Sequence, residues 1–352
     1  MKKGNLTGFQ YFMVHACVET ACFYLLRYHY PLGIAVAIAF IYDFFAFLPQ
    51  GLLGQWIQRH PRIPFETIGN ALMVLSIFPI ASSNTLLHFC GYVVLATGNA
   101  ILHECGAIAT VAESEGKIFP SALFVSGGSV GIVIGQAMGV AQVSPYFLII
   151  PILLSEVFAL MARTSLRKGE YPRFDCEQEG LSPIVILLVA FLVTTVRSYL
   201  GYAIPISWNK EWWQTFFLFF TMGFGKAFGG YVADRFGVRS AALVGTLLAI
   251  PFLIFGENIM VLSIIGVCFF SMTMSISFAM CLSVMPTNPG MAFGITTAAL
   301  FLGLVPVFFV KLSPLANAIL IVICSILCCA LLMTTLKKQG KGKVKNISED
   351  AG

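Results

Sequence analysis

Long apolar runs restrict the fold of this chain more than any other feature. Runs of about 20 largely uncharged residues recur from end to end, the length with which an α-helix crosses roughly 30 Å of hydrocarbon. The 352 residues are 58% hydrophobic and only 11% charged, which excludes a set of soluble domains. The runs do not alternate, which excludes a transmembrane β-barrel. We therefore predict an all-α integral membrane protein.

Glycine, proline and charged residues divide the apolar runs into twelve predicted transmembrane helices. The predicted helices lie near residues 7–26, 32–58, 64–82, 86–111, 118–141, 145–164, 183–205, 212–234, 239–256, 258–284, 290–310 and 314–336. The first run follows Met1-Lys2-Lys3, but it contains His15 and Glu19 and has no small-residue cleavage site. We therefore interpret it as a retained helix and not as a signal peptide.

Basic residues are distributed very unevenly between the predicted loops. If both termini are cytoplasmic, sixteen of the 21 Lys and Arg residues lie in inner segments and three in outer ones, with Arg197 and Lys226 left inside helices. Inner loops of membrane proteins are rich in Lys and Arg, so this bias predicts the orientation. The net charge of +5 is then explained by topology, and no nucleic-acid partner is expected. We expect a monomer in the bacterial plasma membrane.

The chain divides into two halves at its longest polar loop. We predict an N-terminal six-helix bundle over 1–164, a cytoplasmic linker over 165–182, a C-terminal six-helix bundle over 183–336 and a basic cytoplasmic tail over 337–352. A weak repeat supports this division, because the segment from Gly54 to Pro61 lies 176 positions before the segment from Gly230 to Gly237. Two bundles related by a pseudo-twofold axis are a common transporter architecture, with sites at their interface.

The stretch GGYVADRFGVR, residues 229–239, places charges of both signs between two apolar runs. A glycine at 230 permits close helix approach, and Gly237 allows a tight turn. An acid at the helix end can accept hydrogen bonds from a neighbouring helix N-terminus or pair with an arginine. The pattern resembles the cytoplasmic loop motif of the major facilitator superfamily, G-x-x-x-D-R-x-G-x-[RK]. The resemblance implies a twelve-helix secondary transporter, with gating residues at Gly230, Asp234, Arg235, Gly237 and Arg239, and at Gly54 and Arg59 in the first-half copy.

Two departures from that pattern are visible. The first-half copy has Gln58 in place of the acid and Pro61 in place of the glycine, so we expect a weaker charged contact there. The fourth helix lacks the arginine of many proton-coupled antiporters and instead contains GNAILHECG, residues 98–106. This segment and the glycine-rich fifth helix are similar to the fosmidomycin-resistance branch of the superfamily. That similarity does not identify a substrate.

Ionisable residues within the predicted helices are the candidate transport residues. A charge at the bilayer centre costs about 2.5–3.5 kcal/mol on insertion scales, so each such residue needs a partner, water or a function. His15, Glu19 and Cys22 share one helix face by their spacing, and Asn99 shares another with His103. The candidates for the substrate and proton pathway are His15, Glu19, Asp43, Asn99, His103, Glu104, Arg197 and Lys226.

Glu19 and Arg197 lie near the middle of the first and seventh helices, which line the central cavity in the superfamily. We expect Glu19 to carry the coupling proton, because the acids of the first half outnumber the two cations of the second. Arg197 is expected to face Glu19 or an anionic group on the substrate. The alternatives without a transport role are that His103 is a packing residue and that Lys226 extends toward the inner surface.

Other classes of function fit the sequence less well. His15, Glu19 and Cys22 form a metal-ligand face, but no second ligand cluster accompanies them, so we predict no metal site and no cofactor. A membrane-embedded enzyme would use His103 and Glu104, yet adjacent helical residues point about 100° apart. No ATP-binding motif and no signalling domain is present. The prediction is a secondary transporter of a small organic solute, coupled to protons and working by alternating access, with drug or metabolite efflux as an alternative.

Overall fold

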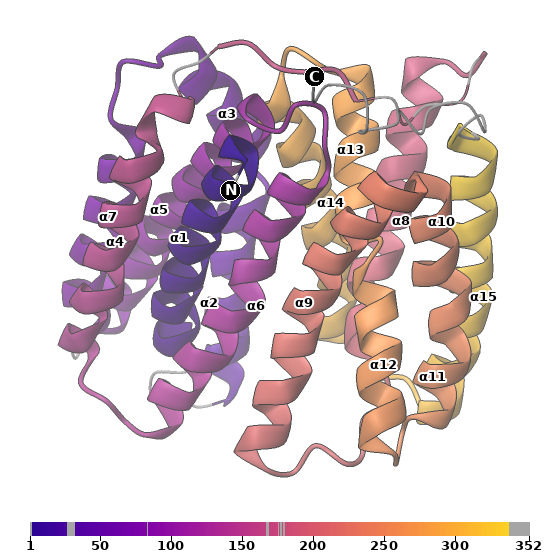
Figure 1. Ribbon diagram of the computed structural model, residues 1–352. Helices are drawn as coiled ribbons and strands as arrows, with labels where there is room; N and C mark the ends of the chain where they lie inside the picture. The colour runs from indigo at the N-terminus through magenta and orange to yellow at the C-terminus, as the bar shows by residue number, and fades with distance from the viewer. Residues whose placement is uncertain are drawn as a thin grey trace.

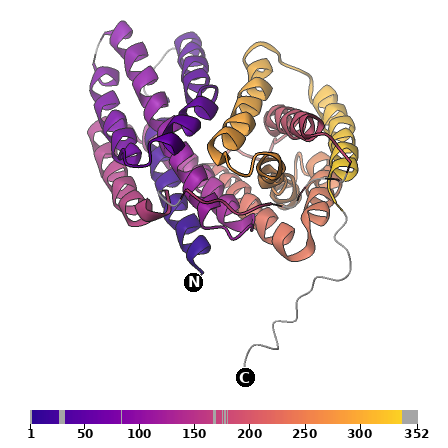
Figure 2. The same ribbon diagram turned by 90° about the horizontal axis from the view of Figure 1, so that it is seen from above.

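The computed structural model describes residues 2–26, 32–82, 84–166, 169–174, 176, 178 and 180–337. The helices form two bundles that stand side by side, the N-terminal half in indigo to magenta and the C-terminal half in pink to yellow (Figure 1). Seen from above, the two halves are separate groups of helices that meet along one face (Figure 2). The predicted tail beyond residue 337 lies outside the described residues.

Among its described residues, the N-terminal half has seven α-helices and a short 3-10 turn, η1. The elements are α1 (Lys3–Leu26), α2 (Leu32–Phe47), α3 (Gln50–Arg59), α4 (Phe65–Ile80), α5 (Thr85–Ala112), α6 (Phe119–Val140), η1 (Pro145–Leu148) and α7 (Ile149–Leu166). The single helix predicted over 32–58 is divided into α2 and α3 at Leu48-Pro49. Proline has no N–H to donate at that point, which explains the break.

The C-terminal half contains eight α-helices and a π-helical turn, η2. The elements are α8 (Pro183–Ala203), α9 (Trp212–Phe236), α10 (Val238–Leu243), η2 (Val244–Leu248), α11 (Ala249–Phe255), α12 (Met260–Ser271), α13 (Met274–Val284), α14 (Pro289–Phe309) and α15 (Pro314–Thr335). Pro251 follows the π-helical turn, where the helical hydrogen-bond register shifts. The helix predicted over 258–284 is interrupted at Met272-Thr273, although no proline lies there.

The predicted twelve-helix membrane architecture is confirmed. By length and composition, ten segments of the described chain are suited to crossing a membrane. Four of them join neighbouring elements: α2 with α3, η1 with α7, α10 with η2 and α11, and α12 with α13. The polar α1, with 24 residues, and the shorter α4, with 16, complete the twelve. An α-helix of 24 residues is about 36 Å long, enough to span the hydrocarbon core.

Glycines set how closely the helices approach within the first half. Gly127, Gly131 and Gly135 of α6 lie directly against backbone atoms of α1, so that any added Cβ would overlap them. This is the close packing expected of a small-residue face. As a consequence, α1 and α6 are held together as one unit, and α6 in turn packs on α9 of the other half.

The linker crosses one end of the molecule, drawn at the top of Figure 1, which we call the linker end. Phe174 and Cys176 of the linker are buried, with only 5% and 2% of their surfaces exposed. Burial raises the pKa of Tyr171, whose hydroxyl also hydrogen-bonds with Gln58. The described part of the linker is therefore packed onto the helices at these residues.

Candidate functional site

Two helix crossings join the halves at the linker end. In the first, Gly54 of α3 lies against Gly290 of α14, and a side chain at either glycine would overlap the other backbone. In the second, Gly230 of α9 lies against Ala122 and Phe119 of α6. The sequence predicted that Gly230 permits close approach, and both crossings depend on the missing Cβ atoms.

Asp234 joins the second half to the start of a first-half helix. Its Oδ1 accepts a hydrogen bond from the backbone N–H of Ile118 at 2.8 Å, and its Oδ2 accepts one from Phe119 at 2.9 Å. These N–H groups belong to the N-terminus of α6, where the helix dipole also favours a negative charge. The sequence predicted this kind of contact.

Gln58 makes the corresponding contact from the first half. Its Oε1 accepts a hydrogen bond from the Gly290 N–H at 3.0 Å, in the first turn of α14. Its Nε2 donates to the Thr287 carbonyl at 3.4 Å. The presence of glutamine in place of the acid thus preserves the contact and removes its charge.

The remaining motif residues lie near the same end. Gly237 ends α9 with φ of 92°, in the region that favours glycine. Arg239 donates to the carbonyls of Met333 and Leu336 at 2.9 and 2.8 Å, which satisfies the C-terminus of α15 within its own half. Arg59 and Arg235 are exposed. Asp234 and the glycines at 54 and 230 are the motif residues for which the structure shows a direct contact with the opposite half.

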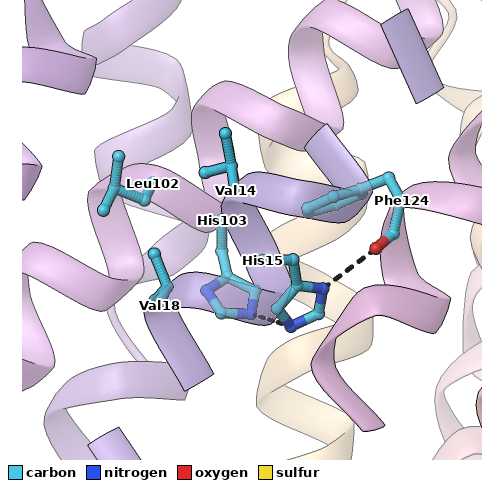
Figure 3. Close-up of a pocket in the computed structure, with 6 residues that line it drawn as sticks. All are labelled: Val14, His15, Val18, Leu102, His103 and Phe124. Carbon is cyan, nitrogen blue, oxygen red and sulfur yellow. Dashed lines mark hydrogen bonds between the residues drawn. The ribbon is translucent and has the colours of Figure 1, made fainter. Parts of the chain in front are cut away.

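Three buried side chains from α1 and α5 converge inside the first half. Nε2 of His15 lies 2.8 Å from Nε2 of His103, and Oε1 of Glu19 lies 3.5 Å from the His103 nitrogen and 3.8 Å from the His15 nitrogen. Each residue is at most 8% exposed. The two imidazoles face each other beside a small pocket that is also lined by Val14, Val18, Leu102 and Phe124 (Figure 3). We call His15, Glu19 and His103 the His-Glu cluster.

Asn99 connects the His-Glu cluster to α2. Its Nδ2 lies 3.1 Å from Glu19 Oε1, 2.5 Å from the Tyr42 hydroxyl and 3.3 Å from Cys22 Sγ. Asp43, next to Tyr42 on α2, is partly exposed and lies within electrostatic range of Glu19. The two polar stripes predicted on α1 and α5 therefore meet in one network.

Lys226 of α9 brings a positive charge toward this network from the second half. Its Nζ donates to Ser129 Oγ of α6 at 3.0 Å, across the interface between the bundles. It lies within electrostatic range of Glu19, His15 and His103. In this conformation the contact with Ser129 holds the Lys226 ammonium at the interface between the bundles.

The predicted contact between Arg197 and Glu19 is absent from this conformation. Arg197 of α8 donates to the Phe270 carbonyl, and its guanidinium carbon lies 4.4 Å from the centre of the Phe270 ring. α8 packs on α13, α14 and α15, away from α1. The Phe270 carbonyl is available because the helix is interrupted two residues later. Of these two second-half cations, Lys226 and not Arg197 lies within electrostatic range of Glu19.

His103 and Glu104 point in different directions and do not form an acid–base pair. His103 contacts His15, whereas Glu104 Oε2 lies at the crossing of Gly54 and Gly290. Glu104 is fully buried, and neither of its carboxyl oxygens has a hydrogen-bond partner among the described residues. The arrangement gives no support to a hydrolytic or acid–base enzyme site.

Several buried or interacting polar residues in and around the site were not among the predicted site residues. Ser129 is hidden within the glycine-rich run of α6, and Tyr42 precedes the more conspicuous Asp43. Glu66 and Glu113 are also buried, at 1% and 5% exposure, and Glu113 pairs with Lys3 at 2.9 Å. Their positions near predicted helix ends made them resemble surface residues. For Ser129 no signal was available, because a partner on another helix leaves no spacing in the sequence.

Solved structures of transporters share this fold. The E. coli fucose:proton symporter FucP aligns with a TM-score of 0.62 and 13% identity over 96% of this chain and 98% of that chain. FucP of the major facilitator superfamily in its outward conformation aligns with a TM-score of 0.60 and 14% identity, over 96% and 99% of the two chains. The human organic anion transporter TETRAN aligns at 0.63 and 15%, over 95% and 99%.

No protein-family model and no curated protein sequence matches the chain. At these identities the structural likeness shows the fold alone. The fold is that of the major facilitator superfamily, with twelve helices in two six-helix bundles.

Proposed function

We propose that this protein is a secondary active transporter of a small organic solute, coupled to protons and working by alternating access of its two halves. The observation that carries the proposal is the placement of the His-Glu cluster in the first half and of Lys226 in the second, with the Lys226 ammonium reaching across the interface to Ser129 of α6. Proton-binding groups and a cation that belong to different bundles change their mutual distance whenever the bundles rock. Such a change is what coupling requires.

The contacts at the linker end are suited to repeated opening. Asp234 and Gln58 hold the halves together with hydrogen bonds to the starts of α6 and α14. A helix cap contributes about 0.5–2 kcal/mol, so each contact can break at modest cost. The glycine crossings add close packing without covalent or metal links. The free energy that holds this end closed is therefore comparable to the free energy that solute binding supplies, so closure is reversible.

Glu104 is placed where protonation and closure are linked. An ionised carboxylate without a partner in an apolar contact is costly, so we expect Glu104 to be protonated while Gly54 and Gly290 are together. Separation of α3 from α14 would admit water and allow the carboxyl group to ionise. Glu104 is thus a second proton site in addition to Glu19. It lies at the crossing of α3 and α14, whereas Glu19 lies in the His-Glu cluster.

An anionic group on the solute fits the cations of the second half. Arg197 is buried and Lys226 is half-buried, and Arg197 Nε has no hydrogen-bond partner among the described residues. A carboxylate or phosphate bound between them would satisfy that donor and offset the repulsion between the two cations. Drug or metabolite efflux uses the same machinery in the opposite direction and stays an alternative. Residence in the plasma membrane as a monomer is part of the proposal.

The direct test is a flux assay with purified protein in liposomes. A pH-sensitive dye is enclosed, and organic acids, sugars and cationic drugs are added one at a time under an imposed proton gradient. We expect proton movement that requires one class of solute and solute accumulation that collapses with a protonophore. Solute uptake that is unaffected by the gradient would remove proton coupling, and the absence of any flux across a broad panel would remove the transport proposal.

A further inference from the structure

We propose that the His-Glu cluster binds a divalent transition-metal ion. The three ligand atoms form a triangle with sides of 2.8, 3.5 and 3.8 Å. Ligand atoms about a tetrahedral ion with bonds of 2.0–2.1 Å lie roughly 3.3 Å apart, within the range of these sides. The sequence offered only His15 and Glu19 with Cys22 on one helix, and the structure supplies the missing ligand as His103 from α5.

The orientation of the two imidazoles leaves both facing nitrogens free to bind a cation. Nδ1 of His15 lies 3.0 Å from the Phe124 carbonyl oxygen, and Nδ1 of His103 lies 3.0 Å from the Asn99 carbonyl oxygen. A carbonyl only accepts hydrogen bonds, so each Nδ1 carries a proton and each neutral ring presents an Nε2 lone pair. Two lone pairs at 2.8 Å repel each other unless a cation lies with them.

The surroundings match those of metal-binding histidines in other proteins. Such histidines usually donate their second nitrogen to a carbonyl or carboxylate, which holds the ring orientation and the tautomer. Both histidines here do so, and Glu19 accepts from Asn99 at 3.1 Å, which orients the carboxylate. Two imidazoles and one carboxylate suit Zn²⁺ and its neighbours in the first transition row. Three protein ligands leave a fourth position for water or a solute.

Two other cations compete for this position. A single proton shared between the imidazoles also relieves the repulsion, since 2.8 Å is an ordinary hydrogen-bond distance. The Lys226 ammonium on α9 and the Asp43 carboxyl on α2 both lie within electrostatic range of Glu19. Lysine therefore opposes a divalent ion, and we expect its removal to strengthen metal binding.

Metal binding goes beyond the proposed transport cycle and does not depend on it. A bound ion requires an ionised Glu19 and occupies the two Nε2 lone pairs, so it would exclude the coupling proton from the cluster and inhibit proton-coupled flux. Binding itself is measurable in the purified protein without any solute. Failure of the transport proposal would leave the metal site untouched, and the reverse also holds.

The test is a titration of the full chain in detergent, with any affinity tag removed. ZnCl₂ is added in a calorimeter to the wild-type protein and to His15→Gln, His103→Gln, Glu19→Gln and Lys226→Gln variants. His60→Gln is the matched control, because His60 is exposed and makes only a local contact with the Trp56 carbonyl. Co²⁺ in place of Zn²⁺ then reports the ligands by its visible spectrum.

We expect one Zn²⁺ per chain in the wild type and in His60→Gln. Loss of a second-sphere partner already weakens metal binding about 10–100-fold, so each ligand variant should lose more than about 100-fold. Lys226→Gln should bind more tightly. The Co²⁺ spectrum should indicate four-coordination without a thiolate charge-transfer band, which separates this site from the ten cysteines.

Three results would overturn the metal site. They are no Zn²⁺ binding to the monodisperse wild-type protein, equal binding by the His103→Gln and His60→Gln variants, and a thiolate band in the Co²⁺ spectrum. The first of these would assign the space between the two imidazoles to a shared proton.

Discussion

Gln58 and Asp234 stand 176 positions apart and make equivalent contacts, each with the first turn of a helix in the opposite half. Asp234 binds two N–H groups of α6 with a charged group, whereas Gln58 binds one N–H group of α14 with a neutral one. The pseudo-twofold relation is therefore preserved in geometry and broken in charge. The two sides of the linker end consequently differ in strength.

Replacement of Asp234 should weaken closure of the linker end, and the effect should grow with the number of contacts that the new residue loses. An asparagine at this position would keep one acceptor oxygen and lose the charge, and an alanine would lose both contacts, so we expect D234N to slow transport and D234A to slow it more. Loss of a cap of about 0.5–2 kcal/mol lowers the closed population roughly 2- to 30-fold. Initial transport rates at equal membrane abundance measure the effect. The matched variant in the first half is Q58E, which adds the charge that Gln58 lacks and should favour closure of the linker end. Normal transport rates in D234A would contradict a role of Asp234 in gating.

A side chain at Gly54 should separate α3 from α14. G54A places a methyl group against Glu104 and Gly290, so we expect the linker end to open and proton-driven accumulation to be lost. The control is G201A in α8, where an added Cβ meets only the Phe270 ring at 3.9 Å. Accessibility of a cysteine introduced by T287C to a thiol reagent measures the opening. Equal accessibility in both variants would contradict the role of this crossing.

Neutralisation of Glu19 should uncouple transport from protons. We expect E19Q to lose accumulation under a proton gradient while solute exchange across the membrane continues, because the amide cannot exchange a proton. K226Q should also impair accumulation, since it removes the cation directed at Glu19. Counterflow and gradient-driven uptake in the same liposomes distinguish the two activities. Concentrative uptake by E19Q with an unchanged pH dependence would reduce Glu19 to a structural partner of Asn99.

Arg197 should resist replacement by lysine. The guanidinium donates to the Phe270 carbonyl and stacks on the Phe270 ring, and an ammonium cannot do both with the same geometry. We expect R197K to fold and to bind an anionic solute about tenfold or more weakly, within the roughly 1.5–3 kcal/mol of a hydrogen bond to a charged group. Binding measured by tryptophan fluorescence tests this. An unchanged affinity would restrict Arg197 to supporting the break between α12 and α13.

The orientation of the chain is open to a labelling test. Cys176 of the linker is buried and therefore unsuitable as a reporter. Lys117 and Lys210 are exposed in loops at opposite ends, between α5 and α6 and before α9. We expect an impermeant thiol reagent to label K210C in intact cells and K117C only after permeabilisation. The reverse pattern would invert the topology predicted from the charge bias.

The membrane architecture was predictable because each apolar run carries its own signal. The interruption at Pro49 also has a local cause, and the contact of Asp234 with a helix N-terminus follows from its place at a helix end. The interruption at Met272-Thr273 has no local marker in the sequence. It coincides with the Arg197 contact at Phe270, which is tertiary.

The site was predictable only within single helices. The spacing of His15 and Glu19 placed them on one face, but nothing in the sequence indicated that His103 would meet His15, 88 positions away. The choice of Lys226 over Arg197 as the cation beside Glu19 depends on how α8 and α9 are placed around the interface. Such relations between helices arise from packing, which leaves no periodic pattern.

The close packing of α1 on α6 has an electrical consequence. Because glycines bind these helices into one body, Glu19 moves with the first half, whereas Lys226 belongs to α9 and moves with the second. Rocking of the halves then displaces opposite charges relative to each other within a low-dielectric layer. The membrane potential acts on any such displacement with about 2.3 kcal/mol per elementary charge and 100 mV for full transit. The voltage across the membrane would therefore bias which side of this protein is open even when no solute is bound.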